Sequence, residues 1–245
     1  MKLSIIIPCF NQTSDLIQCL KSISNQTFNS YEIIVVDGAS KDNVDFFLQP
    51  VPRNMKFVSE PDLGIFDAMN KGVSLAQGEW LYFMGVDDYF YDIDVLKSLA
   101  PLFETKSIKL IIGRIVYRFR DQDSIFIKKN KGLIKPIWSK KIWISNTLPH
   151  QGIFYQRSVF DSKRYDVRYE ILGDYAFNLN LWKEKTPILI AENIIAYCGT
   201  SGISKKFSFS LYNEELLLKT RATSIFYIPL FSILMVVKYF FKKIF

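Results

Sequence analysis

The sequence predicts an α/β fold with a mixed, mainly parallel sheet of the Rossmann-like type, flanked by helices. Short runs rich in β-branched residues alternate along residues 1–100 with segments whose apolar residues recur at helical spacing. Strands joined through helices pair in parallel, with right-handed crossovers. Residues 206–245 lack this alternation and predict a C-terminal amphipathic helical tail.

The expected elements follow from these patterns. The first helix is expected to be capped by Thr13 or Ser14, and the second covers residues 64–76. Beyond residue 105 the pattern is less regular, with a basic loop at 128–149 and a helix at Asp174–Lys183. The expected strands are Leu3–Ile7, Glu32–Val36, Phe57–Val58, Trp80–Met84, Leu110–Ile112, Ile115–Phe119 and Ile188–Tyr197.

Composition fits a folded globular protein. The chain has 245 residues, of which 49% are hydrophobic and 22% charged, and this argues against disorder. Its net charge of +7 suits anionic partners such as a membrane or phosphorylated ligands. We expect no nucleic-acid partner, because zinc-finger spacing and an arginine-rich arm are both missing from the sequence. The three cysteines are expected to be buried free thiols, and the start of the chain does not resemble a signal peptide.

Acidic residues follow the predicted strands. The first strand ends near Pro8, the second at Asp37, and a later one just before Asp87 and Asp88. Ligands of parallel sheets bind beyond the carboxyl ends of the strands, so these carboxylates are expected at one edge. Clustered carboxylates repel one another unless a divalent cation or hydrogen-bond donors relieve the repulsion.

The tail contains an apolar stretch at Ile225–Val237 that includes Pro229. It is shorter than the roughly 20 residues that a membrane-spanning helix needs. Lys238, Lys242 and Lys243 would suit anionic headgroups, which favours a helix lying in the membrane interface. A helix packed on the core is the alternative.

The strand-end motifs together resemble the family 2 glycosyltransferases, which have the GT-A fold, and in particular bacterial members that build surface polysaccharides. A single such motif would be a weak signal, but here they occur in order over about 90 residues. The matching segments are Ser4–Asn11, Glu32–Asp42, Ser59–Gly72, Gly78–Phe83 and Gly85–Asp88.

The resemblance implies a site for a nucleotide-diphosphate sugar. It gives Asp88 the role of ligand to Mn²⁺ or Mg²⁺, where a hard oxygen ligand meets a hard cation. Alternatives stay open: Asp37, Asp87 and Asp88 can be turn residues, and Asp67 with Lys71 can be a surface ion pair. The residues implied for donor binding are Pro8, Asn11, Asp37, Asp67, Lys71 and Asp87.

The resemblance also supplies a candidate base. Asp174 would take the proton of the acceptor hydroxyl, and one carboxylate suffices for a single inverting displacement. An N-cap role is the alternative for Asp174. His150 resembles a residue beside the acceptor site, although a lone histidine can also be structural. Ser201 and Gly202 lie in a small-residue segment that resembles a loop closing over the donor, or is a plain surface loop.

The function implied is inverting transfer of a sugar onto a lipid-linked oligosaccharide of a bacterial surface polysaccharide, at the cytoplasmic face of the cell membrane. Residues 1–205 would form the GT-A domain, with 1–100 binding the donor and 101–205 the polyprenyl-linked acceptor, and 206–245 would contact the membrane. A polyprenyl-phosphate sugar synthase and a non-catalytic scaffold remain alternatives. A Rossmann dehydrogenase is disfavoured because residues 8–13 contain no glycine.

Overall fold

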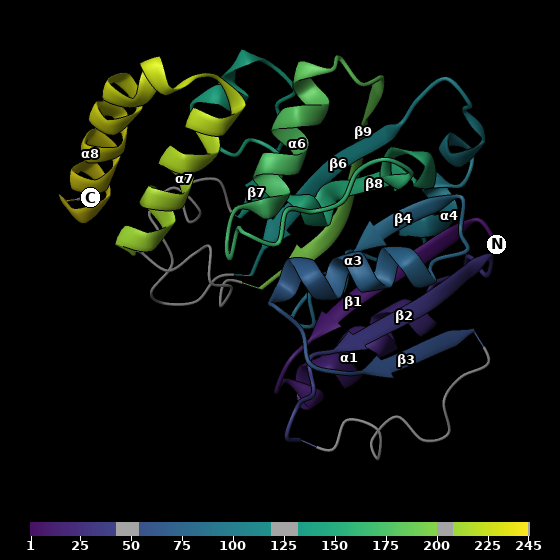
Figure 1. Cartoon of the computed structure of the whole chain (residues 1–245). Helices are drawn as coiled ribbons and strands as arrows, with labels where there is room; N and C mark the ends of the chain where they lie inside the picture. Colours follow the sequence, from purple (N-terminus) through teal and green to yellow (C-terminus); the bar gives the residue numbers. More distant parts are fainter. Residues whose placement is uncertain (43–53, 119–131, 200–207, 245) are drawn as a thin grey trace.

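Buried β-branched runs form the strands of one nine-stranded sheet (Figure 1). The structure is a computed structural model and describes residues 1–42, 54–118, 132–199 and 208–244, with side chains described through residue 240. The strands are β1 (Leu3–Cys9), β2 (Tyr31–Asp37), β3 (Met55–Ser59), β4 (Trp80–Phe83), β5 (Tyr89–Phe90), β6 (Leu110–Tyr117), β7 (Leu133–Ile134), β8 (Ile153–Gln156) and β9 (Ile188–Cys198).

Six α-helices are described alongside the sheet: α1 (Thr13–Ser24), α3 (Ile65–Leu75), α4 (Val95–Leu99), α6 (Gly173–Lys183), α7 (Phe209–Ala222) and α8 (Ile228–Ile244). Short 3-10 helices lie at Leu102–Glu104, Lys140–Trp143, His150–Gly152, Arg157–Phe160 and Ile225–Tyr227.

The sheet is mixed and mainly parallel, as the sequence predicts. Its strand order is β3-β2-β1-β4-β8-β6-β9-β5, with β7 paired to β6. The first four strands in this order run parallel, and β6 runs parallel to β9. β8 is antiparallel to both of its neighbours, so it joins the parallel half to the strands from the second half of the chain.

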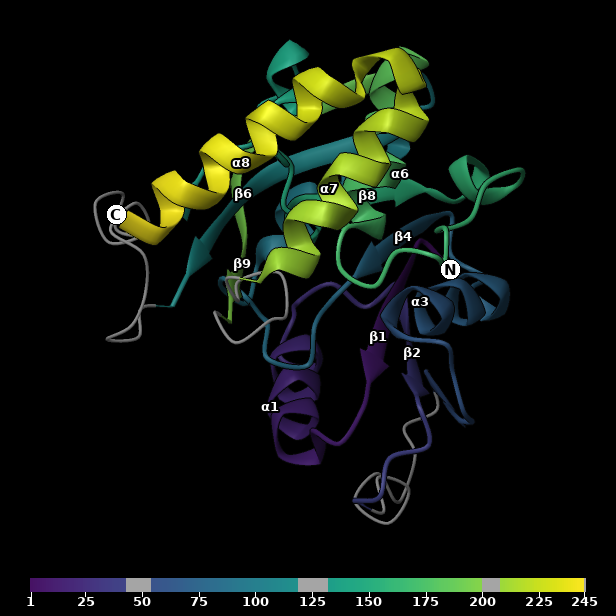
Figure 2. The ribbon, with the colours of Figure 1, turned by 60° about the vertical axis from the view of Figure 1, so that its left-hand side comes forward.

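Both faces of the sheet are covered, which explains why β1 reads as a continuous apolar run. Successive side chains of a strand point to opposite faces. Ile5 and Ile7 therefore pack in one core with Leu16 of α1, while Ile6 packs in a second core with Met69 of α3. Figure 2 shows α1 and α3 on opposite sides of the strands.

Two expectations about elements were wrong. The predicted strands Leu110–Ile112 and Ile115–Phe119 are replaced by one strand, β6, which ends at Tyr117 and has an irregular register between Ile112 and Ile115, while Phe119 lies outside the described residues. A side chain at Gly113 would lie 2.5 Å from Ile195 Cγ1, so only glycine allows β9 to approach this closely. The N-cap of α1 is Gln12, without a side-chain capping bond, and Thr13 is the first helical residue.

The C-terminal helices form a hairpin beside α6, so the helical tail is confirmed (Figure 1). Leu211 and Leu218 of α7 belong to the same core as α6. α8 runs back along α7 and contributes no residue to either core. Within the described ranges, no helix is both long and apolar enough to span a membrane. All three cysteines are buried free thiols, as expected.

Candidate active site

The first functional feature is the edge at which β1, β2 and β4 end. The β1–β2 register places Cys9 opposite Asp37, and β4 lies on the other side of β1. The chain leaves β4 at Phe83 and reaches Asp87 and Asp88 within one turn. The topology therefore brings these three carboxylates to the same edge, as the sequence predicts.

Asp37 is buried, and its carboxylate accepts hydrogen bonds from the segment after β2 and from the end of β3. Its Oδ2 accepts hydrogen bonds from the Ser40 amide at 2.9 Å and the Ser59 hydroxyl at 2.7 Å, and its Oδ1 accepts one from the Ser40 hydroxyl. A carboxylate has about four lone-pair sites, so little capacity remains for a ligand. This geometry suits the turn role left open for Asp37, while donor binding stays a prediction.

Asn11 links the loops that follow β1 and β2. It adopts a left-handed conformation with φ 53°, which asparagine tolerates better than most residues. Its amide donates to the Ser40 hydroxyl at 2.7 Å, and its Oδ1 accepts from the Lys41 amide at 2.9 Å. The preceding Phe10 is 58% exposed. An exposed aromatic ring at the end of β1, two residues after Pro8, offers a surface on which a nucleobase can stack.

Asp67 and Lys71 form the expected i,i+4 ion pair on α3, with Nζ 3.4 Å from Oδ2. Lys71 also pairs with Glu60 at 3.0 Å and donates to the Pro61 carbonyl at 2.8 Å. Asp67 accepts from the Leu63 amide at 3.1 Å. The pair therefore holds the segment between β3 and α3, and its predicted contact with the donor stays a prediction.

Asp87 and Asp88 lie in a turn that is closed by backbone amides. Asp88 is 1% exposed, and its two carboxylate oxygens accept from the Gly85 amide at 2.9 Å and the Gly199 amide at 3.1 Å. Asp87 is partly exposed beside it. A side chain at Gly199 would stand 1.8 Å from Asp87 Oδ2, so glycine is required for this approach.

The charge of Asp88 is poorly compensated. Burial raises the pKa of its carboxyl to about 6, and the Asp87 charge also raises it, while His150 and the two amides lower it. A carboxyl whose pKa is higher in the folded chain stabilises the fold at low pH, and this contribution is lost as pH rises through about 6. A cation bound at neutral pH would remove that penalty.

Asp174 lies in the first turn of α6, against His150. The His150 Nδ1 is 3.2 Å from Asp174 Oδ2, and Asp174 Oδ1 accepts from the Tyr175 amide at 2.7 Å. The N-cap of α6 is Leu172, so the capping role considered for Asp174 was wrong. Gly173 allows the start of α6 to lie close to α3, because a Cβ atom at position 173 would be 2.7 Å from the Phe66 ring of α3.

The carboxylates and the histidine share one region of the molecule. His150 is near enough to Asp88 to lower the pKa of that carboxyl. Asp88 and Asp174 both contribute to the raised pKa of Tyr117, for which burial is the main cause. Ser201 and Gly202 lie outside the described residues, and their predicted roles are not addressed by the structure.

One residue of this region was missed by the sequence analysis. Arg118, just after β6, donates to the Asp87 carbonyl at 2.8 Å and lies over the Tyr89 ring at 4.4 Å. It brings a cation to the turn that carries both aspartates, and no motif in the sequence pointed to it. Gly199 begins the small-residue segment that resembles a loop over the donor, but the bond from its amide to Asp88 was not predicted.

The residues fit a divalent cation shared with a phosphorylated ligand. No set of three or more His, Cys, Asp or Glu in the described parts of the chain is placed to enclose a metal ion. Mg²⁺ is commonly held by only one or two carboxylates together with substrate phosphates and water. Asp87 and Asp88 supply such a pair, and burial, which raises the pKa of Asp88, disfavours its charge unless positive charge is added nearby.

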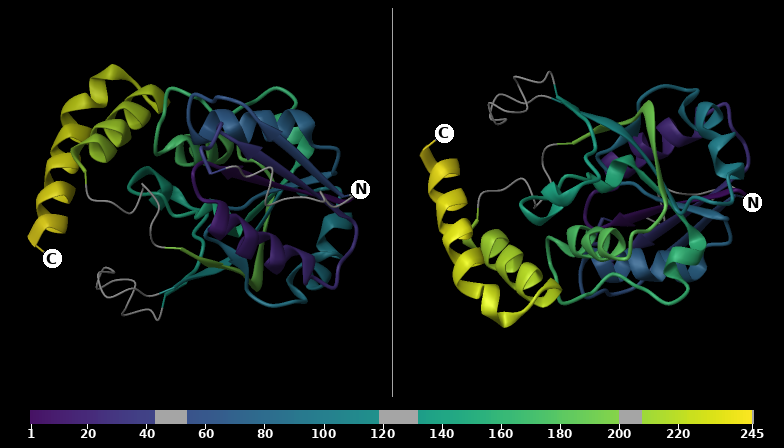
Figure 3. Two further views of the ribbon diagram at one scale, coloured as in Figure 1. Left: turned by 90° about the horizontal axis from the view of Figure 1, so that it is seen from below. Right: turned by 90° about the horizontal axis from the view of Figure 1, so that it is seen from above.

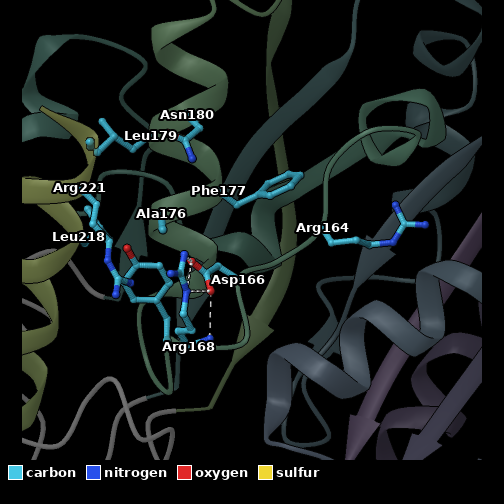
Figure 4. A pocket seen from close by; sticks show the side chains of 11 residues that line it. Arg164, Asp166, Arg168, Ala176, Phe177, Leu179, Asn180, Leu218 and Arg221 are labelled. Atoms are coloured by element: carbon cyan, nitrogen blue, oxygen red, sulfur yellow. Dashed lines mark hydrogen bonds and ion pairs between the residues drawn. The ribbon is translucent and has the colours of Figure 1, made fainter.

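A separate cavity of about 200 Å³ lies between α6, α7 and the segment before α6 (Figure 4). Arg168 is paired with Asp166 at 2.7 Å, and Arg221 lies over the Tyr169 ring at 5.5 Å. Arg164 points away from this group in Figure 4. The aspartates of the sheet edge do not line this cavity.

Comparison with known protein families shows to which family the chain belongs. The model of "Glycosyl transferase family 2" matches residues 4–195, which include the sheet edge, His150 and Asp174. The chain belongs to glycosyl transferase family 2. It is therefore a glycosyltransferase, and the resemblance inferred from the strand-end motifs is confirmed.

Relatives of this glycosyltransferase cover most of its length. A "PGL/p-HBAD biosynthesis glycosyltransferase" of Mycobacterium tuberculosis is 30% identical over 234 residues, covering 89% of this chain and 85% of the relative. Another M. tuberculosis protein, described as an uncharacterized glycosyltransferase, is 30% identical over 203 residues, covering 82% of this chain and 76% of the relative.

Solved structures confirm the GT-A type fold. S. aureus TarS 1-349, determined in complex with UDP, has a TM-score of 0.68 at 19% identity, covering 91% of this chain and 65% of TarS 1-349. A mannosyltransferase from Pyrobaculum calidifontis, determined with GDP-Man and Mn²⁺, has a TM-score of 0.66 at 16% identity and covers 90% of this chain. The glycosyltransferase thus spans about two thirds of the length of these two chains, 65% and 62% respectively.

Proposed function

We propose that this glycosyltransferase is metal-dependent and inverting, and that it moves a sugar from a nucleotide-diphosphate sugar to a lipid-linked oligosaccharide acceptor. The observation that carries the proposal is the contact between His150 and Asp174 in the same region as the Asp87–Asp88 turn. A single displacement at a sugar carbon is favoured by a base for the acceptor hydroxyl and by positive charge at the departing diphosphate, and these residues could supply the first directly and the second by holding a cation.

Asp174 is the proposed base. The acceptor hydroxyl becomes a competent nucleophile when Asp174 accepts its proton as the new bond forms. Asp174 is 9% exposed, which limits access of bulk water. His150, through Nδ1, holds the Asp174 carboxylate in one orientation, and the Tyr175 amide fixes its other oxygen.

Asp87 and Asp88 are the proposed holders of the donor diphosphate through a divalent cation. When bound, the cation supplies positive charge against the charge that develops on the departing diphosphate. Asp87 is the more open of the two carboxylates, whereas Asp88 is held by two amides. Arg118 adds a guanidinium at the same turn. The neighbours solved with UDP, or with GDP-Man and Mn²⁺, support this class of donor.

The proposed acceptor and cellular location are based on the name of a relative and on the C-terminal tail. One of the two mycobacterial relatives is named for PGL/p-HBAD biosynthesis, and the tail of this chain carries an apolar helix next to lysines. We propose a polyprenyl-linked glycan acceptor and a peripheral position on the cytoplasmic face of the cell membrane.

Nucleotide titration tests the donor half of the proposal. Purified protein would be titrated calorimetrically with UDP, GDP and dTDP, with and without Mn²⁺, alongside Asp88→Ala and Asp174→Asn. We expect one nucleotide to bind in a metal-dependent way, with binding lost in Asp88→Ala and kept in Asp174→Asn. If no nucleotide binds in the presence of metal, the donor assignment is wrong.

Transfer kinetics test the base. General-base catalysis contributes about 10²- to 10⁴-fold, so Asp174→Asn should lower kcat by that order with donor affinity unchanged. The anomeric configuration of the product, read by proton NMR coupling, should be opposite to that of the donor. Retention of configuration, or full activity of Asp174→Asn, would contradict the inverting mechanism.

A further inference from the structure

Among the side chains that the structure describes at 225–240, the exposed ones are all apolar or tyrosine. Figure 3 shows α8 at the margin of the molecule farthest from the N-terminus, with α7 on its inner side. Phe226, just before α8, is 88% exposed, and Ile233 in its middle is 65% exposed. Contiguous apolar surface of this kind marks an interaction site. This surface, here called the α8 face, consists of Ile225, Phe226, Tyr227, Pro229, Leu230, Ile233, Val236, Val237 and Phe240.

The one charged side chain that the structure describes in α8 points toward α7. Lys238 is the one charged residue among positions 228–240, and its Nζ pairs with Glu215 of α7 at 2.5 Å. Lys219 of α7 pairs with the same carboxylate at 2.5 Å, and both lysines donate to the Ile144 carbonyl. A helix facing water places its lysine outward and its apolar residues inward. The reverse arrangement here suits a helix whose outer side faces hydrocarbon.

A second copy of the chain is a poorer fit than a bilayer. Phe226, Leu230, Ile233, Val237 and Phe240 do recur at the spacing of a coiled-coil seam. Coiled-coil pairs, however, flank a narrow seam with charged residues that set partner and register. The flanks here are also apolar, so the α8 face is wider than a seam and has no charges to specify a protein partner.

Positive charge lies in a chain segment that contacts the hairpin. The segment that includes Ile144, which is bonded to both lysines of the hairpin, also carries exposed Lys135, Lys140 and Lys141. Ile144 itself is 55% exposed. An apolar surface with lysines beside it matches a bilayer that contains anionic lipids, where hydrocarbon lies below negatively charged headgroups.

We infer that the α8 face docks on an anionic lipid bilayer, with α8 lying parallel to the membrane plane. A helix of 17 residues is about 25 Å long and is tied along its inner side to α7, which suits an in-plane position rather than a crossing. The inferred docking follows from the residues of the α8 face and its neighbouring lysines. The use of this docking to reach a lipid-linked acceptor rests on the proposed function.

Vesicle binding by the full-length protein tests the inference. The probes are phosphatidylcholine vesicles with and without phosphatidylglycerol, and the readout is co-sedimentation. We expect binding to the anionic vesicles that weakens with salt, and a fall of about tenfold or more in the partition coefficient for Ile233→Glu. Ile93→Glu is the matched control, since Ile93 is 56% exposed, lies between β5 and α4 outside the hairpin, and should leave vesicle binding like that of wild type.

A label at position 233 checks the geometry. The native cysteines are buried, so a polarity-sensitive dye can be attached to Ile233→Cys or Ile93→Cys. Vesicles should shift the emission of the dye at 233 to shorter wavelength and leave the dye at 93 unchanged. Absence of vesicle binding by folded wild type, equal binding by Ile233→Glu, or a wild-type dimer that Ile233→Glu dissociates without any vesicle binding would overturn the inference.

Nucleotide titration of the same variants separates the two proposals. If Ile233→Glu binds nucleotide and metal normally but wild type does not bind vesicles, the docking inference and the proposed membrane position fail, while the proposed sugar transfer stands. If wild type binds vesicles but no nucleotide, the proposed function fails and the docking inference stands.

Discussion

Asp88 and Asp174 differ in what holds their charges. Asp174 faces a histidine ring, whereas Asp88 accepts from two backbone amides and makes no ion pair with any residue that the structure describes. Burial therefore raises the pKa of Asp88 to about 6. This contrast supports the different roles that we propose for the two acids, Asp174 as proton acceptor and Asp88 as a ligand of a cation.

Gly199→Ala tests the closure of the aspartate turn. The new Cβ would overlap Asp87 Oδ2, so the carboxylate must move. We expect the metal-dependent nucleotide affinity to fall at least about tenfold, a loss of roughly 1.4 kcal/mol, with a modest change in Tm. Titration calorimetry measures it, with Glu192→Ala on the preceding strand as an exposed control. An unchanged affinity in a folded Gly199→Ala protein would mean that Asp87 does not contact the donor complex.

Glu32 provides a pH prediction away from the site. Burial favours a higher pKa, but hydrogen bonds from Ser4, Lys56 and the Gln77 amide outweigh it and lower the pKa of Glu32. Because the folded value lies below the unfolded value near 4.5, Glu32 stabilises the fold above pH 4.5, and this stability is lost as pH falls through the folded pKa.

Glu32→Gln should therefore lower the free energy of unfolding at pH 7 by about 1–2 kcal/mol, since Lys56 is partly exposed and the pair is screened. The difference from wild type should shrink as pH falls below 4.5. Urea unfolding at several pH values measures both effects, and a constant difference down to low pH would refute the role of the Glu32 charge.

At the scale of elements, local patterns predict the parallel half of the sheet well. β1 and β2 are buried on both faces, so their residues form uninterrupted apolar runs that the sequence displays directly. β8 was not expected, because its position depends on pairing with β4 and β6, which lie far away in sequence. β6 was divided in two because Gly113 looks like a break, whereas its role is to admit the Ile195 side chain.

The approach of α6 to α3 sets the position of the proposed base. A methyl group at Gly173 would press on the Phe66 ring and move the start of α6. Misplacement of a catalytic group by about 1 Å can cost about 100-fold, so Gly173→Ala should lower kcat by about tenfold or more with donor affinity kept.

Phe66→Leu makes room and should restore part of the activity when combined with Gly173→Ala, giving a positive coupling in a double-mutant cycle. Steady-state kinetics of the four proteins measure this coupling. Strictly additive losses would indicate that the two residues do not act through their contact.

At the scale of the whole molecule, the candidate site combines residues from both halves of the chain. The amide of Gly199 reaches Asp88 across 111 residues, and Arg118 reaches Asp87 across 31. Motifs predicted the acids, because each follows a recognisable strand or opens a helix. The partners of those acids could not be predicted, since a glycine amide and an arginine guanidinium acquire their roles only when β6 and β9 pair.

Unlike α7, α8 contributes no described side chain to either core of the sheet, so its stability should be separable from that of the sheet. Burial lowers the pKa of Lys219, while the Glu215 charge opposes this effect. Glu215→Gln would leave Lys219, with 3% of its side chain exposed, and Lys238 without a counter-charge. Removing one partner of a buried ion pair lowers the stability of the fold. Here we expect the hairpin to be destabilised by about 2 kcal/mol, because Lys238 is partly exposed.

We expect amide hydrogen exchange over residues 228–240 to accelerate about tenfold or more in Glu215→Gln, while protection of β1, β2 and β4 stays close to wild type. Glu184→Gln, which breaks an exposed pair with Lys163, is the matched control and should change neither region. Because α8 adds nothing to the sheet cores, donor binding should survive its loosening while vesicle binding weakens. Equal acceleration throughout the sheet would instead mean that hairpin and sheet unfold as one cooperative unit.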